Sequence, residues 1–234
     1  MKGENLVWDS KFFGYSIHKV FLDPENDSDS RLDAYILAHK PDLLYLFSPK
    51  KHPSLEEKSV LMDEKTTFIR KVGYSPLSSV KSNLTILPYA GDLVPPLEEL
   101  AWESGSSSRF KKDARLSPKF KELYSLWMKK SLEREIADAV FVCYDGQIMA
   151  GMVSVQKIEV AARLGIIAVH PSCRGRRIGE MLMRQAEAWC IGQQLEWLHV
   201  VTQGNNASAC NFYRSMGYTV KSVEYVYHYW IRNK

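Results

Sequence analysis

The C-terminal two thirds of the chain alternate short apolar runs with longer stretches in which apolar residues recur every three or four positions. The short runs predict strands, and the recurring spacing predicts amphipathic helices. Strands are predicted over residues 84–86, 139–144, 147–157, 163–169 and 195–202, with one or two more over residues 219–230. Helices are predicted from Pro95 onward, over residues 120–132, from Ile178 to a C-cap at Gly192, and over residues 206–216 before Gly217. Strands joined by helices imply an α/β fold with a mixed central sheet flanked by helices.

The N-terminal third carries shorter elements. Strands are predicted over residues 6–8, 17–22, 43–48 and 66–72, and a helix over residues 31–39. A polar stretch, residues 78–83, separates these elements from the clearer pattern that follows. We therefore predict two domains: a smaller α/β domain over residues 1–82, which helps to shape a substrate site, and a main domain over residues 83–234.

Composition narrows the class of protein. The 234 residues suit either one large domain or one standard domain plus a smaller one. No apolar run approaches the ~20 residues that span a bilayer, and residues 1–5 lack the apolar core of a signal peptide, so we expect a cytoplasmic protein without membrane insertion. The net charge of +4 is too small to indicate nucleic-acid binding. Four cysteines without C-x-x-C spacing are expected to be free thiols, and no residue spacing suggests a metal site.

The most informative segment follows the apolar run that ends at Val169. It reads His-Pro-Ser-Cys-Arg-Gly-Arg-Arg-Ile-Gly-Glu over residues 170–180 and leads into a helical pattern. The N–H groups at a helix N-terminus lack intrahelical partners, and the helix dipole favours negative charge there. Glycine lets a ligand approach the backbone, and arginine side chains add charge-assisted donors. The segment therefore predicts a diphosphate site.

Two segments together resemble the motifs of the GNAT family, the acetyl-CoA-dependent N-acetyltransferases. Residues 169–179 resemble its pyrophosphate loop, an Arg or Gln followed by x-x-Gly-x-Gly or Ala. Residues 206–218 resemble its later segment, Asn-x-x-Ala-x-x-Phe-Tyr-x-x-x-Gly-Phe/Tyr. The resemblance covers about residues 84–234, and it departs from the pattern at Arg177, where the family usually has glycine.

The resemblance implies a binding site for acetyl-CoA. The residues that it assigns to the coenzyme are Ile167, Ala168, Val169, Arg174, Gly175, Arg176, Arg177, Ile178, Gly179 and Asn206. In the family, the strand before the loop splays from its neighbour, so that its last backbone groups pair with pantetheine and stabilise the thioester oxygen. The alternative for the loop alone is a basic strand-to-helix turn that binds no ligand.

Tyr213 is the expected general acid, because the resemblance makes it face the coenzyme sulfur. A tyrosine pKa of about 10 lies above the ~8.5 of a thiol, so the hydroxyl stays protonated and is available as a donor throughout the physiological range. The alternative is a core tyrosine on a helix that also buries Phe212. Asn206 is expected to cap this helix. For the general base, Glu159, His170, His199 and water alone all stay open.

Shorter matches resemble the branch of the family that acetylates dTDP-fucosamine. They include residues 6–14, residues 162–165, Thr202-Gln203 and the pair Arg109-Phe110, which we assign to substrate binding. This branch implies a nucleotide-linked amino sugar as acceptor and an extra N-terminal domain. A peptide N-terminus, lysine, polyamine or antibiotic as acceptor, and a coenzyme-binding regulatory module without turnover, remain alternatives. A solvated basic loop is the alternative for Arg109. The oligomeric state, including a homodimer, is left open.

Overall fold

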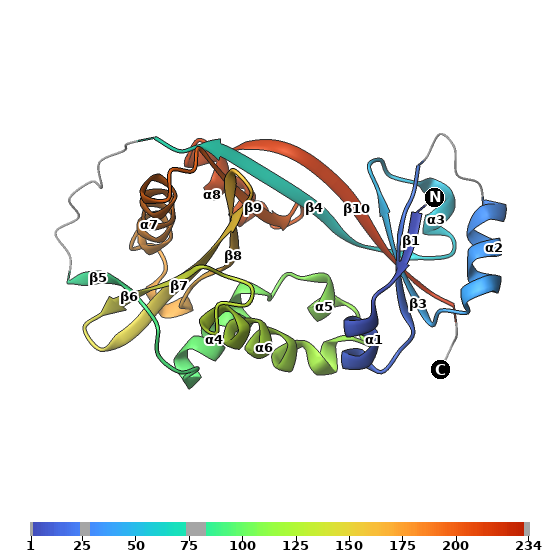
Figure 1. The fold of residues 1–234 in the computed structure, drawn as a ribbon, viewed down its shortest axis with the longest axis horizontal. Helices are drawn as coiled ribbons and strands as arrows, with labels where there is room; N and C mark the ends of the chain where they lie inside the picture. The colour runs from blue at the N-terminus through green and yellow to red at the C-terminus, as the bar shows by residue number, and fades with distance from the viewer. Residues whose placement is uncertain (1, 24–28, 74–82, 232–234) are drawn as a thin grey trace. The chain divides into compact units, whose positions relative to one another are not determined.

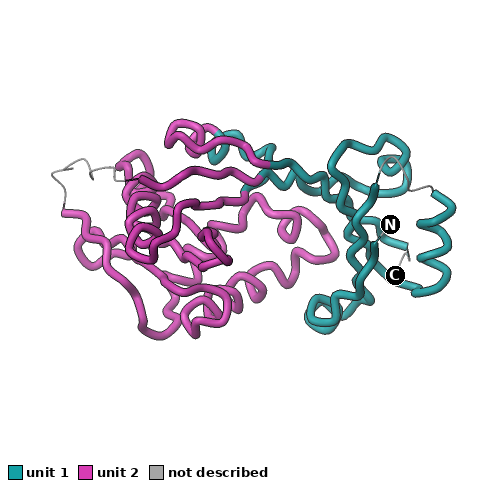
Figure 2. Tube along the Cα trace, turned by 45° about the horizontal axis from the view of Figure 1, so that its top comes forward, with its two compact units in different colours: residues 1–66, 202–210, 222–234 teal, residues 67–201, 211–221 magenta. Residues whose placement is uncertain are grey.

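The computed structural model describes residues 2–23, 29–73 and 83–231. The chain forms two compact units (Figure 2). Unit 1 comprises residues 1–66, 202–210 and 222–234, and unit 2 comprises residues 67–201 and 211–221. Most of the boundary expected at residues 78–83 lies outside the described residues, so the proposed division at residue 82 stays a prediction.

Unit 1 is built on strands in the order β1-β2-β3-β10-β4. Its elements are β1 (Lys2–Asn5), α1 (Val7–Phe13), β2 (Ile17–Phe21), α2 (Asp29–His39), β3 (Leu43–Ser48), α3 (Pro53–Glu56), the first part of β4 (Val60–Lys71) and most of β10 (Thr219–Trp230). β2 and β3 are parallel, whereas β3 and β10 are antiparallel. All six residues of β3 are buried, as a strand covered on both faces requires. The core consists of Val20, Leu22, Leu32, Leu44, Leu46, Leu55 and Tyr227.

Unit 2 has strands in the order β4-β9-β8-β7-β6-β5. Its other elements are β5 (Leu84–Pro88), α4 (Pro95–Ser104), α5 (Arg109–Lys112), η1 (Ser117–Lys119), α6 (Phe120–Leu132), β6 (Ala139–Asp145), β7 (Ile148–Ile158), β8 (Ala161–Val169), η2 (Pro171–Cys173), α7 (Ile178–Gly192), β9 (Trp197–Gln203) and α8 (Ala207–Ser215), which begins in unit 1. β8 and β9 are parallel, and the β5–β8 neighbours are antiparallel. α7 covers one face of this sheet, and α4 and α6 cover the other (Figure 1). The predicted mixed sheet flanked by helices is confirmed.

One predicted element has the wrong type. The strand expected at residues 6–8 is the start of α1, in which Trp8 and Phe12 stack with ring centroids 5.1 Å apart. These residues are four positions apart, and residues at this spacing are neighbours on the surface of a helix. Gly14, with φ 79°, ends α1 in the left-handed conformation, and its N–H donates to the carbonyl of Ser10. A run of three apolar residues does not distinguish strand from helix, and here the following aromatic spacing decides.

Smaller differences concern helix ends and short elements. The helices α3 and α5 have no counterpart in the prediction, and residues 219–230 form a single strand. Helix α7 ends at Gly192 as predicted, but its C-cap is Gln193, and the left-handed residue beyond it is Gln194, with φ 59°. Among the described residues, no helix is long and apolar enough to cross a membrane, and no group of His, Cys, Asp and Glu side chains is arranged to hold a metal ion. All four cysteines are free and buried.

Candidate active site

The strand before the basic loop is irregular on both sides. Against β7, Val153 pairs with Ile167 and Val155 with Leu164, so that Gly165 and Ile166 stand opposite Ser154 alone. The Ile166 N–H donates to the Ser154 hydroxyl at 2.8 Å instead of to a ladder carbonyl. This arrangement is a β-bulge, which bends a strand and often lies beside a functional site.

On its other side, β8 separates from β9 before it reaches the loop. In these two strands, both described throughout, the parallel pairing covers only residues 161–163 against residues 197–199. Backbone groups of residues 164–169 on this edge are therefore not paired with β9. An extended ligand with amide groups can pair with such an edge as a further strand does, because each strand residue carries one donor and one acceptor. Pairing of residues 167–169 with the coenzyme stays a prediction.

The loop itself is shaped by two left-handed residues. Gly175 has φ 77°, and Arg177 has φ 61° and ψ 15° and immediately precedes α7. The left-handed conformation explains why glycine suits position 177. An L-amino acid in this conformation raises the conformational energy by about 1–2 kcal/mol, whereas glycine does not. Gly179 lies so close to α8 that a Cβ atom there would be 3.3 Å from the Phe212 ring. Arg177 therefore has the left-handed backbone conformation that the family's glycine adopts easily, although its residue type differs.

Carboxylates balance the charges of the three loop arginines. Arg174 pairs with Glu103, Arg176 Nη1 lies 2.5 Å from Asp145 Oδ2, and Arg177 Nε lies 2.8 Å from Glu180 Oε2. The hydrogen bond from Arg176 holds the pKa of Asp145 below its usual value, and the nearby positive charge adds to this effect. About half of each arginine side chain is exposed, so these pairs contribute little to stability. A phosphate group can therefore replace the carboxylates as partners of the arginines with little loss of free energy.

Tyr213 is buried within an aromatic cluster in unit 2. It is 4% exposed, and the ring centroids of Phe68, Phe212 and Tyr218 lie 5.7, 5.4 and 6.2 Å from its own. Phe212, its neighbour in sequence, packs against Gly179 at the start of α7. Tyr213 is therefore a core residue, which was the alternative to an acid role. Through Phe212, the helix that carries Tyr213 packs against the loop. Its role as an acid remains a prediction.

The remaining predicted residues have these surroundings. Asn206 Oδ1 accepts a hydrogen bond from the Ala209 N–H at 3.1 Å, which confirms the predicted N-cap of α8. Arg109 and Phe110 begin the short helix α5 rather than a loop, and the Arg109 guanidinium lies 4.4 Å from the Phe110 ring centroid. Phe110 is 7% exposed and packs edge-on against Trp127. The coenzyme role of Asn206 and the substrate roles of Arg109 and Phe110 stay predictions.

The three candidates for a general base differ in position. Glu159 lies in the exposed turn before β8, so the length of this strand, about 25 Å, separates it from the loop. His170 lies in the loop, where its Nδ1 is 2.7 Å from the Ser172 hydroxyl. His199 lies in β9, where burial lowers its pKa and the charge of Lys221 lowers it further. His199 is therefore neutral at neutral pH and can accept a proton, but none of the three is assigned.

Sequence reasoning missed one group of polar residues. Glu187 is almost completely buried on the apolar stripe of α7, where it meets Arg70, Arg184 and Tyr218. A carboxylate on the buried face of a helix is the signal that could have revealed it, because such a group is almost never buried without partners.

Comparisons with known proteins agree with this geometry. A model of the acetyltransferase (GNAT) family matches residues 96–218. The chain is 26% identical over 133 residues to the spore coat polysaccharide biosynthesis protein SpsD of Bacillus subtilis, a match that covers 56% of this chain and 46% of SpsD. It is 29% identical over 106 residues to a streptothricin acetyltransferase of Escherichia coli, a match that covers 43% of this chain and 60% of the relative. The matches thus span about half the length of these curated relatives.

Solved structures show the same fold. A GCN5-related N-acetyltransferase from Sphaerobacter thermophilus superimposes with a TM-score of 0.63 at 13% identity, covering 99% of this chain and 76% of that chain. A similar enzyme from Kribbella flavida gives a TM-score of 0.57 at 12% identity, covering 91% of this chain and 80% of that chain.

Proposed function

Because the chain belongs to the acetyltransferase (GNAT) family, we propose that it transfers an acetyl group from acetyl-CoA directly to an amine, the amino group of a nucleotide-linked amino sugar. One observation carries the proposal. The strand edge at residues 164–169 is unpaired with β9, and it leads directly into the arginine loop and the N-terminus of α7. This sequence of groups suits a ligand with an amide-bearing arm and a diphosphate.

The residues present fit coenzyme A in kind. The N–H groups of Ile178 and Gly179 belong to the first turn of α7, where helix geometry provides no intrahelical acceptor. Gly175 adds a left-handed backbone residue, and Arg174 and Arg176 add donors suited to phosphate oxygens. Backbone groups of residues 167–169 would bind the pantetheine amides, as the family resemblance implies. Electrostatic stabilisation by such fixed dipoles is usually the largest contribution to acyl transfer.

The proposed reaction needs one proton donor from the protein. The acceptor nitrogen forms a bond to the thioester carbonyl carbon, the carbon–sulfur bond breaks, and the thiolate takes the proton of the Tyr213 hydroxyl. The proton released by the amine restores the tyrosine hydroxyl through solvent. Protein protons thus balance over one turnover, and no acyl-enzyme is formed. Cys173 is 3% exposed, which fits a reaction without a cysteine nucleophile.

The choice of acceptor rests on the branch resemblance and on one relative. SpsD is named for polysaccharide biosynthesis, which supports a sugar acceptor. The streptothricin acetyltransferase supports an antibiotic amine as the second candidate. Arg109, next to Lys111 and Lys112 in α5, would suit the diphosphate of a nucleotide sugar, whereas an acceptor with several positive charges would be repelled there.

The acid role is tested by steady-state kinetics of Tyr213→Phe. We expect kcat to fall by about 10²- to 10⁴-fold, because a positioned general acid contributes that much, while the affinity for acetyl-CoA changes little. Tyr89→Phe is the matched control, because the Tyr89 hydroxyl donates only to the Asp92 carbonyl in an exposed turn. Full activity of Tyr213→Phe would rule out the acid role.

The acceptor is tested by thermal shift, because a ligand that binds only the native state raises apparent stability. Nucleotide amino sugars and streptothricin are compared in the presence of coenzyme A. A shift with the sugars alone supports the proposal, and a shift with streptothricin alone replaces it. If acetyl-CoA raises the midpoint but no amine is acetylated, the chain is a coenzyme-binding module without turnover.

A further inference from the structure

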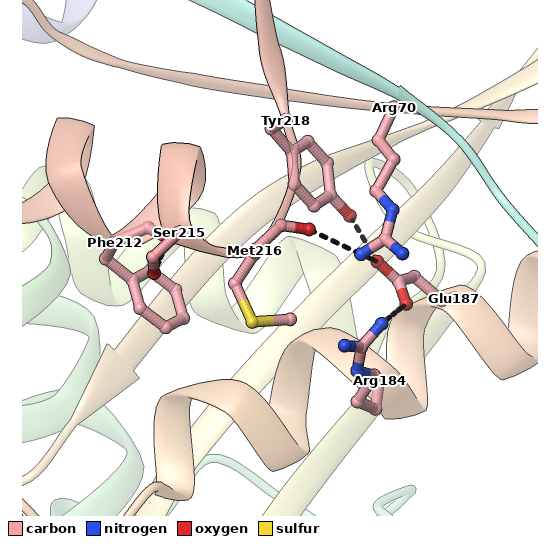
Figure 3. A network of polar contacts seen from close by, with 7 residues as sticks. All are labelled: Arg70, Arg184, Glu187, Phe212, Ser215, Met216 and Tyr218. Carbon is pink, nitrogen blue, oxygen red and sulfur yellow. Dashed lines mark hydrogen bonds and ion pairs between the residues drawn. The ribbon is translucent and has the colours of Figure 1, made fainter. Parts of the chain in front are cut away.

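A buried polar network lies under the C-terminal end of α8, with Glu187 at its centre (Figure 3). The Glu187 side chain is 4% exposed. It accepts hydrogen bonds from Arg70 Nη1 at 3.1 Å, Arg184 Nη1 at 2.9 Å and the Tyr218 hydroxyl at 3.0 Å. Arg70 Nη1 also donates to the Met216 carbonyl at 2.5 Å. All of these residues belong to unit 2.

The Met216 carbonyl belongs to the cap that closes α8. The Tyr218 N–H donates to the Tyr213 carbonyl at 3.0 Å, and the Gly217 N–H donates to the Arg214 carbonyl at 2.9 Å. With Gly217 at φ 80°, these two bonds form a Schellman motif. In this motif Tyr213 is the helix residue whose carbonyl the cap engages, and its ring packs against Tyr218, as commonly accompanies the motif.

The network therefore forms hydrogen bonds to the cap at two residues. Arg70 binds the carbonyl of Met216, and Glu187 binds the side chain of Tyr218. Two positions before Arg70 on β4, Phe68 packs on the Tyr213 ring. Residues two apart on a strand share one face, so a single face of β4 contacts both the cap and the ring of Tyr213. Burial, followed by the charge of Glu187, raises the pKa of Tyr218, which keeps its hydroxyl protonated as a donor.

We propose that Arg70 and Glu187 are positioning residues for acetyl transfer, which hold the cap of α8 and so fix the Tyr213 hydroxyl relative to the coenzyme loop. This inference rests on the acid role proposed for Tyr213. Stability alone does not explain why two arginines and a carboxylate are placed here. A buried ion pair contributes little to the free energy of unfolding compared with apolar residues of similar volume.

The test compares Arg70→Met with Lys71→Met. Lys71 neighbours Arg70 on β4 but pairs at 3.2 Å with the exposed Glu196, so its loss removes a surface ion pair only. For folded Arg70→Met and Glu187→Gln, we expect kcat to fall by about 10- to 100-fold with an unchanged KM for acetyl-CoA, since a misplacement of about 1 Å has such an effect. Arg70→Lys, which keeps the charge and N–H donors, should retain more activity than Arg70→Met, and Lys71→Met should match the wild type.

A double-mutant cycle with Tyr213→Phe separates this inference from the acid role. If Arg70 acts through Tyr213, adding Arg70→Met to Tyr213→Phe lowers kcat no further, because the two residues act as a unit. Effects that multiply, or an unchanged kcat in folded Arg70→Met, overturn the positioning role while leaving the acid role intact. An active Tyr213→Phe overturns the acid role itself.

Tyr218→Phe provides a milder version if Arg70→Met does not fold. It removes only the hydroxyl that donates to Glu187 and keeps the ring that packs on Tyr213. A smaller fall in kcat without a change in KM supports the inference, and wild-type kinetics contradict it.

Discussion

Gly151 offers a sharp test of how the loop is supported. It lies on β7, paired with Val169 at the end of β8. A Cβ atom on Gly151 would lie 2.9 Å from the Ala168 carbonyl oxygen, 3.0 Å from Ile178 Cγ2 and 3.1 Å from Leu182 Cδ1. The two side-chain carbons can shift, but the carbonyl belongs to the β7–β8 ladder. Gly151→Ala must therefore strain the β7–β8 ladder at the Ala168 carbonyl and displace the Ile178 and Leu182 side chains, by which α7 packs on this strand.

The expected loss of stability is about 2 kcal/mol, within the ~1–3 kcal/mol typical of overpacking. For a chain of this size, that loss lowers the melting midpoint by about 4–8 °C. The affinity for coenzyme A should fall as well, because Ile178 is the first residue of the helix whose N-terminus would bind the diphosphate. Differential scanning fluorimetry measures the first effect, and isothermal titration calorimetry measures the second.

Gly192→Ala is the matched control at the other end of α7. A Cβ atom there would meet nothing within 4 Å, and the residue is helical. Alanine should therefore stabilise the protein by about 0.5–1 kcal/mol and leave coenzyme affinity unchanged. Equal midpoints for wild type and Gly151→Ala would refute the packing argument. A lower melting midpoint for Gly151→Ala with unchanged affinity for coenzyme A would refute the link between the packing of α7 on the sheet and the diphosphate site.

Two further predictions concern charge. Asp145→Asn should tighten coenzyme A binding by up to about fivefold at low salt, because it frees Arg176 from an exposed ion pair of small strength. Isothermal titration calorimetry at two salt concentrations measures this affinity, and weaker binding by Asp145→Asn would contradict the prediction. For His18, burial and then the charge of His39 lower its pKa, so the native state binds fewer protons than the unfolded state and stability falls as the pH drops below about 6.5. His18→Gln should therefore reduce the loss of melting midpoint between about pH 7 and pH 5, and an unchanged loss would show that His18 does not contribute to it.

The sequence predicted those elements whose pattern is long or whose chemistry is local. Helix α6 has the predicted bounds because thirteen residues give several turns of apolar spacing. The loop at residues 174–179 was visible because its glycines, its arginines and the helix start are consecutive. The left-handed backbone of Arg177 could not be predicted from an arginine, since only the family's glycine hinted at it.

The rest depends on contacts between distant parts of the chain. Arg70 and Glu187 are 117 positions apart, and their pairing follows from the adjacency of β4, β9 and β8 with α7 on that sheet. Helix α1 was mistaken for a strand because its first apolar residues form too short a run. The pairing of β3 with β10, which builds unit 1 from both ends of the chain, likewise leaves no local signal.

The most direct test of the proposed function is a mass-spectrometric assay of the wild-type protein with acetyl-CoA and a panel of amines that includes nucleotide amino sugars, streptothricin and a polyamine. We expect one nucleotide amino sugar to gain a single acetyl group while an equal amount of free coenzyme A appears. Formation of free coenzyme A without any acetylated amine, or no loss of acetyl-CoA with any acceptor, would contradict the proposed acetyl transfer.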